Sequence, residues 1–307
     1  MSDDVSRLIF DQLQRERRRE RHATYFKYAV LLGLGVGYLS VLAMGFSLRD
    51  NKPDEPYVAV VRIEGEIIAG KSAAAKVVTP VLDKAFADKD AKGVVLIINS
   101  PGGTPVQSAL IHDRIQYLKA KHNKSVAVVG QDLLTSGAYL IAVAGDHIAA
   151  NRSTLVGSIG VVSRGFGFTG LLDKLGVERR VMTAGESKNL LDPFGPQTEQ
   201  DKLKQAELLE AIHAHFKEIV IAGRKERLNL ETEGLFSGTV WTGEQALKAG
   251  LIDELADAQQ VARERFGVEK MFEYSRTRSL LDRVLTTVSA TVADELAPKI
   301  QGPMAVP

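Results

Sequence analysis

Two short segments carry residues that can do chemistry, and each follows an apolar run of the kind that forms a buried strand. The first is Asn99-Ser-Pro-Gly-Gly-Thr104, which follows Val94–Ile98. Proline followed by two glycines lets the backbone turn sharply and leaves N–H groups exposed at the start of a helix. Such amides can form an oxyanion hole or an anion site, although the same residues also make an ordinary strand-to-helix turn. The segment lacks the Gly-Lys-Ser/Thr ending of a phosphate-binding P-loop.

The second segment is Ser136-Gly-Ala-Tyr139, which lies between the apolar run 125–129 and an apolar helical stretch. Small residues after a serine let the chain turn so that the hydroxyl projects into a cleft, and a helix N-terminus favours developing negative charge. Ser136 is therefore a candidate nucleophile. The alternative is that Ser136 only caps the helix, as most serines at such positions do. The segment is not a Gly-x-Ser-x-Gly elbow, because position 134 is leucine.

A serine nucleophile needs a base. The six histidines lie in expected helices, beside an expected strand or before the apolar N-terminal run, without a local motif, and no His-Glu-x-x-His zinc motif occurs. Lysine can replace histidine where burial keeps its amine partly neutral. Lys188 lies in the turn-rich stretch 183–196 after an expected strand. Periodicity alone does not choose Lys188 among the lysines, most of which are solvated.

The composition excludes several other chemistries. The 307 residues include no cysteine, which rules out disulfides, cysteine zinc sites, iron–sulfur clusters and a cysteine nucleophile. The 39 basic and 38 acidic residues nearly cancel, so net charge gives no attraction to nucleic acid. An apolar fraction of 45% and a charged fraction of 25% are typical of a globular chain. The length allows one large domain or two small ones.

The N-terminal segment consists of a highly charged stretch followed by a long uncharged one. Residues 15–21 read Arg-Glu-Arg-Arg-Arg-Glu-Arg, whereas Tyr28–Leu48 contains no charge over 21 residues. At about 1.5 Å rise per residue, this run can cross a hydrocarbon core about 30 Å thick. Tyr25 and Phe26 fit an aromatic belt at one edge, and the arginine cluster places the N-terminus in the cytoplasm by the positive-inside rule.

A cleaved signal peptide is the competing interpretation, with Ala43-Met-Gly45 as a weak cleavage site. The charged preface of about 27 residues is long for a signal peptide, so we expect an uncleaved single-pass anchor. The expected N-terminal divisions are a basic cytoplasmic segment at 1–27, a transmembrane helix at 28–48 and a linker at 49–56.

Residues 57–275 are expected to form one α/β domain, because strand and helix patterns alternate along them. Strands are expected over 57–68 with a break at Gly65, and over 94–98, 125–129, 147–150 and 177–182. Helices are expected over 77–87, 106–121, 137–143, 171–175, 199–223, 243–249 and 257–266. Repeated strand–helix units imply a mostly parallel sheet with right-handed crossovers.

Five motifs occur in order within about residues 57–265. They are Ile98-Asn-Ser-Pro-Gly-Gly103, Thr135-Ser-Gly-Ala-Tyr139, Val156-Gly-Ser-Ile-Gly-Val161, Gly185-Glu-Ser-Lys188 and Val240-Trp-Thr-Gly-Glu-Gln-Ala-Leu-Lys-Ala-Gly-Leu-Ile-Asp253. Together they resemble the short form of the bacterial signal peptide peptidase A family, membrane-anchored Ser-Lys proteases of the Clp protease/crotonase superfamily. The resemblance implies an α/β fold of repeated ββα units with a mostly parallel sheet.

The resemblance also implies a catalytic role for five residues. They are Ser136 as nucleophile, Lys188 as general base, Ser158 as the residue that orients Lys188, and Gly103 and Gly137 as the oxyanion hole. The chain departs from many members at Ala138, where they have glycine. Alanine is small, so we expect little effect if its φ is negative.

The implied protein is a membrane-anchored serine endopeptidase that degrades cleaved signal peptides and other apolar peptides. The resemblance places it in the bacterial inner membrane, with the catalytic domain on the extracytoplasmic side. It implies a homo-oligomer, from a tetramer to an octamer arranged as a ring or dome. We expect Ser136 and Lys188 to act within one chain, with no metal, no cofactor and no nucleic acid.

Two other classes remain as alternatives. A crotonase-type acyl-CoA enzyme shares the oxyanion architecture, but an outward-facing domain lacks access to cytoplasmic CoA. A non-catalytic membrane scaffold of the same fold would need neither Ser136 nor Lys188. Residues 276–307 are expected to form an amphipathic helix and tail, which pack on the domain or a neighbouring subunit, or contact a groove or membrane.

Overall fold

The structure, a computed structural model, describes residues 18, 21, 24–38, 52–185 and 187–275. The chain divides into two units, Met1–Lys52 and Pro53–Pro307. In the first unit, residues 24–38 are helical and exposed. Within the described residues, no helix combines the length and the apolar character needed to cross a bilayer. Of the expected span 28–48, residues 39–48 lie outside the described part of the chain.

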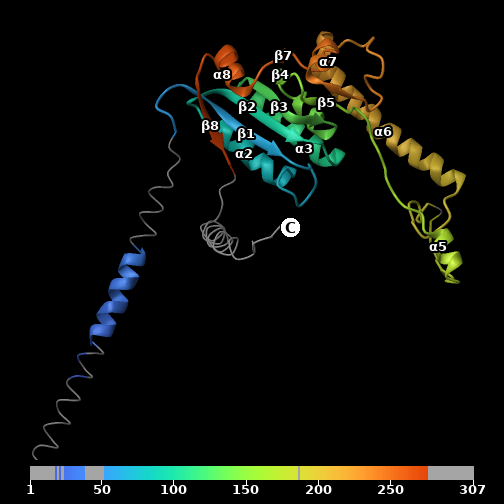
Figure 1. The fold of residues 1–307 in the computed structure, drawn as a ribbon, viewed down its shortest axis with the longest axis horizontal. Coiled ribbons are helices and arrows are strands. Elements are labelled where there is room, and N and C mark those ends of the chain that lie inside the picture. Colours follow the sequence, from blue (N-terminus) through green and yellow to red (C-terminus); the bar gives the residue numbers. More distant parts are fainter. Residues whose placement is uncertain (1–17, 19–20, 22–23, 39–51, 186, 276–307) are drawn as a thin grey trace, which may run out of the picture. The chain divides into compact units, whose positions relative to one another are not determined.

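The second unit is built on one eight-stranded sheet (Figure 1). The strands run in the order β6-β5-β3-β2-β1-β8, with β4 beside β3 and β7 beside β4. Their bounds are Tyr57–Glu64 (β1), Ala91–Ser100 (β2), Val126–Thr135 (β3), His147–Ala150 (β4), Leu155–Gly157 (β5), Val240–Thr242 (β6), Glu254–Leu255 (β7) and Lys270–Tyr274 (β8). Every pair is parallel except β5–β6. The expected α/β fold with a mostly parallel sheet is confirmed.

Helices cover both faces of the central strands, which explains why those strands are apolar on both sides. The helices α2 (Ala75–Ala87), α3 (Pro105–His122) and α4 (Gly137–Ala142) pack on one face. On the other face, α8 (Ala258–Phe266) packs against alternate residues of β1 and β2. The sheet is therefore a rigid platform, and both β2 and β3 lead directly into helices on the same face.

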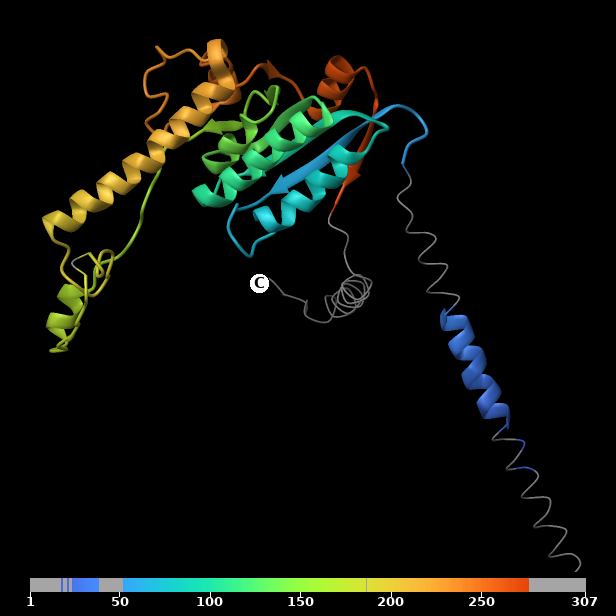
Figure 2. The same cartoon turned by 180° about the vertical axis from the view of Figure 1, so that it is seen from behind.

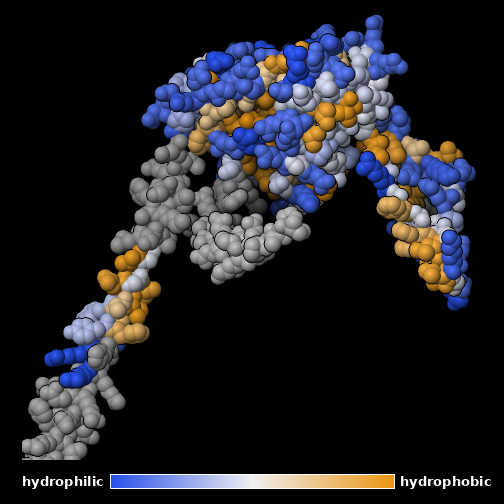
Figure 3. Space-filling view, in the orientation of Figure 1, coloured by the Kyte–Doolittle hydropathy of each residue, from blue (hydrophilic) through white to orange (hydrophobic). Residues whose placement is uncertain are grey.

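One long helix carries part of the chain away from the sheet. The helix α6 (Glu199–Arg224) begins with a capping box between Thr198 and Asp201. Residues 163–198, here called the arm, contain α5 (Thr169–Lys174) and lie at the far end of α6 (Figures 1 and 2). Apolar side chains gather on the surface of the arm (Figure 3), and Met182 is 97% exposed.

The opposite end of α6 is held firmly against the core. Gly223 passes so close to α4 that a Cβ on it would stand 2.6 Å from the Val143 carbonyl oxygen. Arg224 is 1% exposed and pairs with Asp253 at 2.7 Å. The remaining short helix α7 (Gly243–Lys248) follows β6 and begins with a second capping box, between Thr242 and Gln245.

The observed elements differ from the expected ones in identifiable places. The strand expected over 177–182 is wrong, because these residues form no strand and lie exposed in the arm, where no neighbouring strand can pair with them. The strands β5, β6 and β7 have only two or three residues, too few to show a periodicity. The helix expected within 276–307 lies outside the described residues.

Candidate active site

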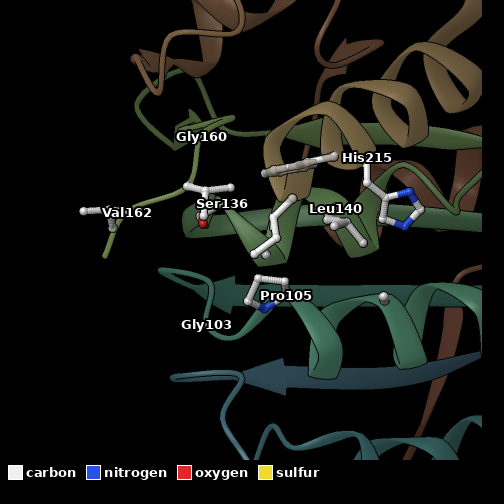
Figure 4. Close-up of a pocket in the computed structure, with 12 residues that line it drawn as sticks. Gly103, Pro105, Ser136, Leu140, Gly160, Val162 and His215 are labelled. Atoms are coloured by element: carbon white, nitrogen blue, oxygen red, sulfur yellow. The ribbon is translucent and has the colours of Figure 1, made fainter. Parts of the chain in front are cut away.

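Ser136 lies at the turn between β3 and α4 with a backbone conformation that serine rarely adopts, φ 54° and ψ −125°. Its N–H donates to the Gly157 carbonyl at 2.7 Å, and its carbonyl accepts from the Leu140 N–H at 3.0 Å. Ser136 occupies the N-cap position of α4, but its hydroxyl makes no capping hydrogen bond to the helix. The turn leaves the side chain in the lining of a cleft (Figure 4).

Gly103 contributes a backbone N–H that is turned away from its neighbouring chain. Gly103 pairs with Ile67 in a single parallel bridge. The Gly102 carbonyl accepts from the Ile67 N–H at 2.9 Å, and the Thr104 N–H donates to the Ile67 carbonyl at 3.0 Å. Because C=O and N–H point in opposite directions across a trans peptide, the Gly103 N–H points away from Ile67.

Gly137 contributes a second backbone N–H. It is the first residue of α4, so its N–H has no acceptor within the helix. A Cβ on Gly137 would stand 3.2 Å from the Gly103 nitrogen, which shows how closely the two amides are placed. Over the described residues, neither N–H has a hydrogen-bond partner. Two free amides beside a serine hydroxyl are the arrangement that stabilises a tetrahedral oxyanion.

Gly102 explains why this site contains two successive glycines. It has φ +98°, which strains any residue with a side chain, and a Cβ there would stand 2.7 Å from the Gly137 nitrogen and from Ser136 Cβ. The turn after β2 therefore packs directly on the turn after β3. Gly103 is equally restricted, because a Cβ on it would stand 2.2 Å from the Ile67 carbonyl oxygen.

The cleft beside Ser136 is mainly apolar (Figure 4). Its apolar lining comes from α3, α4, α6 and the chain after β5: Pro105, Ala109, Leu140, Val161, Val162, Ile212 and Phe216. His215 also lines it, on the side of α6. The sequence indicates a surface or packing position for this histidine, and its side chain is exposed, while the packing of α6 also places it in the cleft lining. An apolar cleft with a few polar groups suits an apolar peptide side chain.

Ser158 is brought beside Ser136 by the pairing of β3 with β5. Thr135 is in register with Gly157, so the residues that follow each strand are neighbours. Ser158 has φ +52°, and its N–H donates to the Thr239 carbonyl at 2.8 Å. Its backbone is therefore firmly placed near the nucleophile. Its expected role in orienting Lys188 stays a prediction.

Lys188 is placed differently from the other expected site residues. It lies in the arm with an exposed side chain, and its N–H donates to the Gly185 carbonyl at 3.1 Å in a tight turn. Across the described residues, no hydrogen bond or ion pair joins its amine to another group. The structure thus brings together Ser136, Gly103 and Gly137. The Lys188 side chain is not buried in this single chain, and its role as base stays a prediction.

A buried ionic cluster packs against α4, and the sequence patterns did not indicate it. The Tyr139 hydroxyl donates to the Leu251 carbonyl at 2.7 Å, and burial raises the pKa of Tyr139. Burial also opposes ionisation of Asp253, but hydrogen bonds from Arg224 and the charge of Arg224 outweigh this effect and lower the Asp253 pKa. Asp253 further accepts from the Ile148 N–H at 2.8 Å. This cluster joins α6, β4 and the chain between α7 and β7 into one support.

The fold and the site define an α/β protein with a Clp protease-like architecture, in which a serine on a strained turn faces two free backbone amides. The Clp protease family model matches residues 59–170, and the model described as peptidase family S49 matches residues 119–268. A protein named as a protease in Synechocystis sp. is 34% identical over 218 residues, covering 69% of this chain and 75% of that protein. The chain belongs to peptidase family S49.

Other relatives differ in length and in name. The Na(+)/H(+) antiporter NhaA of Brucella melitensis biotype 1 is 46% identical over 237 residues, covering 75% of this chain and 32% of that protein. An Enterococcus faecium protein with the provisional name of signal peptide peptidase SppA is 35% identical over 175 residues, covering 57% of this chain and 50% of that protein. The chain thus spans about a third of the Brucella relative and half of the Enterococcus one.

Proposed function

We propose that this chain is a membrane-anchored serine endopeptidase that degrades cleaved signal peptides and other apolar peptides. The single observation that carries this proposal is the placement of Ser136, on a strained turn in an apolar cleft beside the free N–H groups of Gly103 and Gly137. Strain of this kind persists where the surrounding structure imposes it and is common at active sites. Membership of a peptidase family supports the same activity.

The proposed reaction is acyl transfer through Ser136. The Ser136 oxygen forms a bond to the peptide carbonyl carbon while Lys188 accepts the hydroxyl proton. The N–H groups of Gly103 and Gly137 donate to the resulting oxyanion. Collapse of the intermediate breaks the C–N bond, and protonated Lys188 supplies the proton that the leaving amine requires. Water then hydrolyses the ester and restores the Ser136 hydroxyl.

This mechanism requires the Lys188 segment to approach Ser136 in the working enzyme. Lys188 belongs to the arm, whose exposed apolar side chains include Phe166, Leu175 and Met182. Covering these side chains, by closure of the arm or by a neighbouring subunit, would also remove water from around Lys188. We propose that Ser158 then orients the amine and that Lys188 serves the Ser136 of its own chain.

The substrate class is proposed from the cleft and the N-terminus together. The apolar lining around Ser136 suits apolar side chains, as signal peptides have. The uncharged run Tyr28–Leu48 would hold the domain beside the bilayer in which such peptides lie, with the arginine cluster at 15–21 on the cytoplasmic side. The proposed location is the bacterial inner membrane, with the catalytic domain outside the cytoplasm.

We also propose that the chain works as a homo-oligomer, a ring or dome of four to eight copies. The support for this is the group of exposed apolar side chains on the arm (Figure 3), since clustered exposed apolar side chains often mark an interaction surface. Mass determination of the full chain in detergent, by light scattering with correction for bound detergent, tests it. A monomer at micromolar concentration would contradict it.

The catalytic assignment is tested with Ser136→Ala and Lys188→Ala in the full chain. We expect the wild type to cleave an apolar fluorogenic peptide and to label with a serine-reactive fluorophosphonate, and each variant to lose turnover by at least about 10³-fold. Ser153→Ala and Lys174→Ala are matched controls, because Ser153 and Lys174 are exposed and lie outside the cleft, and both should keep full activity. Full activity in Ser136→Ala or Lys188→Ala would refute the assignment. A wild type that neither turns over nor labels would favour the non-catalytic scaffold.

Mixing the two inactive variants tests whether the dyad lies within one chain. When both residues come from one chain, no mixed oligomer of Ser136→Ala and Lys188→Ala contains a complete site, so activity should stay absent. Activity that returns on mixing under exchange conditions would show that Lys188 acts on a neighbouring Ser136. Energy transfer between donor- and acceptor-labelled subunits under the same conditions controls for subunit exchange.

A further inference from the structure

We infer that Ser100 is a positioning residue for the oxyanion hole, an inference that rests on the proposed peptidase function. Ser100 is the last residue of β2 and is fully buried. Its Oγ accepts a hydrogen bond from the Gly102 N–H at 3.1 Å. The sequence pattern around Gly102 and Gly103 accounts for the glycines by the turn they allow, but it assigns no task to the serine that precedes them.

The hydrogen bond from Gly102 to Ser100 fixes one side of a flexible residue. Glycine at φ +98° has access to many conformations, so its orientation depends on what holds its two peptide planes. Ser100 holds the plane before Gly102 through the Gly102 N–H. Ile67 holds the plane after it, because the Ile67 N–H donates to the Gly102 carbonyl at 2.9 Å. That second plane contains the Gly103 N–H, so the two contacts together aim the Gly103 donor.

The two turns pack closely together, so the direction of the Gly103 N–H is tightly constrained. A Cβ on Gly102 would stand 2.7 Å from the Gly137 nitrogen, so there is no room for a side chain between Gly102 and the second donor. Ser100 is in register with Leu134 of β3, two residues before Ser136. Ser100 therefore links the strand that ends at the nucleophile to the turn that carries the oxyanion donor. It acts through Gly102 and contacts no substrate.

Loss of the Ser100 hydroxyl should weaken transition-state stabilisation and leave substrate binding intact. Removing an oxyanion donor outright costs about 10²–10³ in turnover. Misaligning one donor should cost less, so we expect Ser100→Ala to lower kcat about 10- to 100-fold. The cleft residues are unchanged, so KM for an apolar peptide should stay near the wild-type value. Ser100→Thr keeps a hydroxyl that can accept from the Gly102 N–H and should restore most of the activity.

The experiment measures kcat, KM and inhibition by a peptide aldehyde in the full chain. The aldehyde adds the Ser136 O–H across its C=O bond and places an oxygen in the oxyanion hole, so its affinity should fall in Ser100→Ala in proportion to kcat. Thr154→Val is the matched control, because Thr154 is 1% exposed and its Oγ1 accepts the Asn151 N–H at 3.0 Å, before β5 and outside the cleft lining. The control should lose stability and keep its kcat.

Three results would overturn the inference while the wild type is active. They are an unchanged kcat and aldehyde affinity in Ser100→Ala, no recovery in Ser100→Thr although it folds, or an equal loss of kcat in Thr154→Val. The last result would show that the loss of kcat comes from a general loss of stability and not from a misplaced Gly103 N–H. A wild type without turnover or fluorophosphonate labelling would instead refute the proposed function, and the inference with it.

Discussion

Substitution of Gly102 by alanine tests the geometry of the site more directly than removal of the nucleophile. Gly102 has φ +98°, and a Cβ there would stand 2.7 Å from the Gly137 nitrogen and 2.9 Å from the Thr135 carbonyl oxygen. Two separate costs follow. The backbone conformation strains alanine by about 1–3 kcal/mol, and the new methyl group must push the backbone of Ser136 and Gly137 away.

The size of the displacement can be worked from the contact distances. Ordinary contact for a Cβ begins at 3.4 Å, so the methyl group must move relative to the Gly137 nitrogen by 3.4 − 2.7, or about 0.7 Å. A misplacement of about 1 Å at a catalytic group can cost about 10²-fold in rate. We therefore expect Gly102→Ala to lower kcat about 10²-fold, which corresponds to about 2.7 kcal/mol at 1.36 kcal/mol for each factor of ten.

A matched control separates the strain from the displacement. Gly70 has φ +86° and open space where its Cβ would stand, so Gly70→Ala carries a similar strain without a clash. The assay compares urea unfolding and kcat per fluorophosphonate-reactive site for the wild type and both variants. We expect both variants to lose stability but only Gly102→Ala to lose turnover. If Gly102→Ala keeps the wild-type kcat, the two turns do not form the oxyanion hole.

Three further predictions concern the ionic cluster behind α4 and the apolar cleft. Arg224→Met should destabilise the fold by about 3 kcal/mol in urea unfolding, because it removes the 2.7 Å ion pair of the Asp253 charge and leaves the more distant Arg227, at 3.4 Å, and His147, at 3.7 Å; an unchanged midpoint would contradict the importance of this pair. The lowered pKa of Asp253 stabilises the folded state fully above the ordinary Asp range, and this contribution is lost as the pH falls through the folded-state value. Asp253→Asn should therefore be less stable at pH 7 and lose less stability from pH 7 to 3 than the wild type; equal acid dependence would refute this. Ala109→Leu narrows the apolar cleft and should raise KM for peptides with large apolar side chains about tenfold, with kcat for small side chains retained.

Much of the central fold followed from local sequence patterns, for a physical reason. The apolar runs 94–98 and 125–129 lie within β2 and β3, because a strand buried on both faces needs apolar residues throughout. The spacing of residues 199–223 predicted a helix, and these residues lie within α6. The strand expected over 177–182 failed because a strand needs a partner, and local sequence does not tell whether a partner is present. Strands as short as β6 and β7 form only where the neighbouring chain already lies in place.

At the site, the sequence alone determined the residue types that the chemistry needs: a serine before a short apolar helix, and glycines where no Cβ fits. Only the tertiary structure decided their use. It aimed the Gly103 N–H through the Ile67 bridge, left the Ser136 hydroxyl without a capping partner and placed His215 in the lining of the cleft. It also left Lys188 exposed in the arm. These outcomes depend on contacts between residues far apart in the chain, and such contacts leave no local pattern in the sequence.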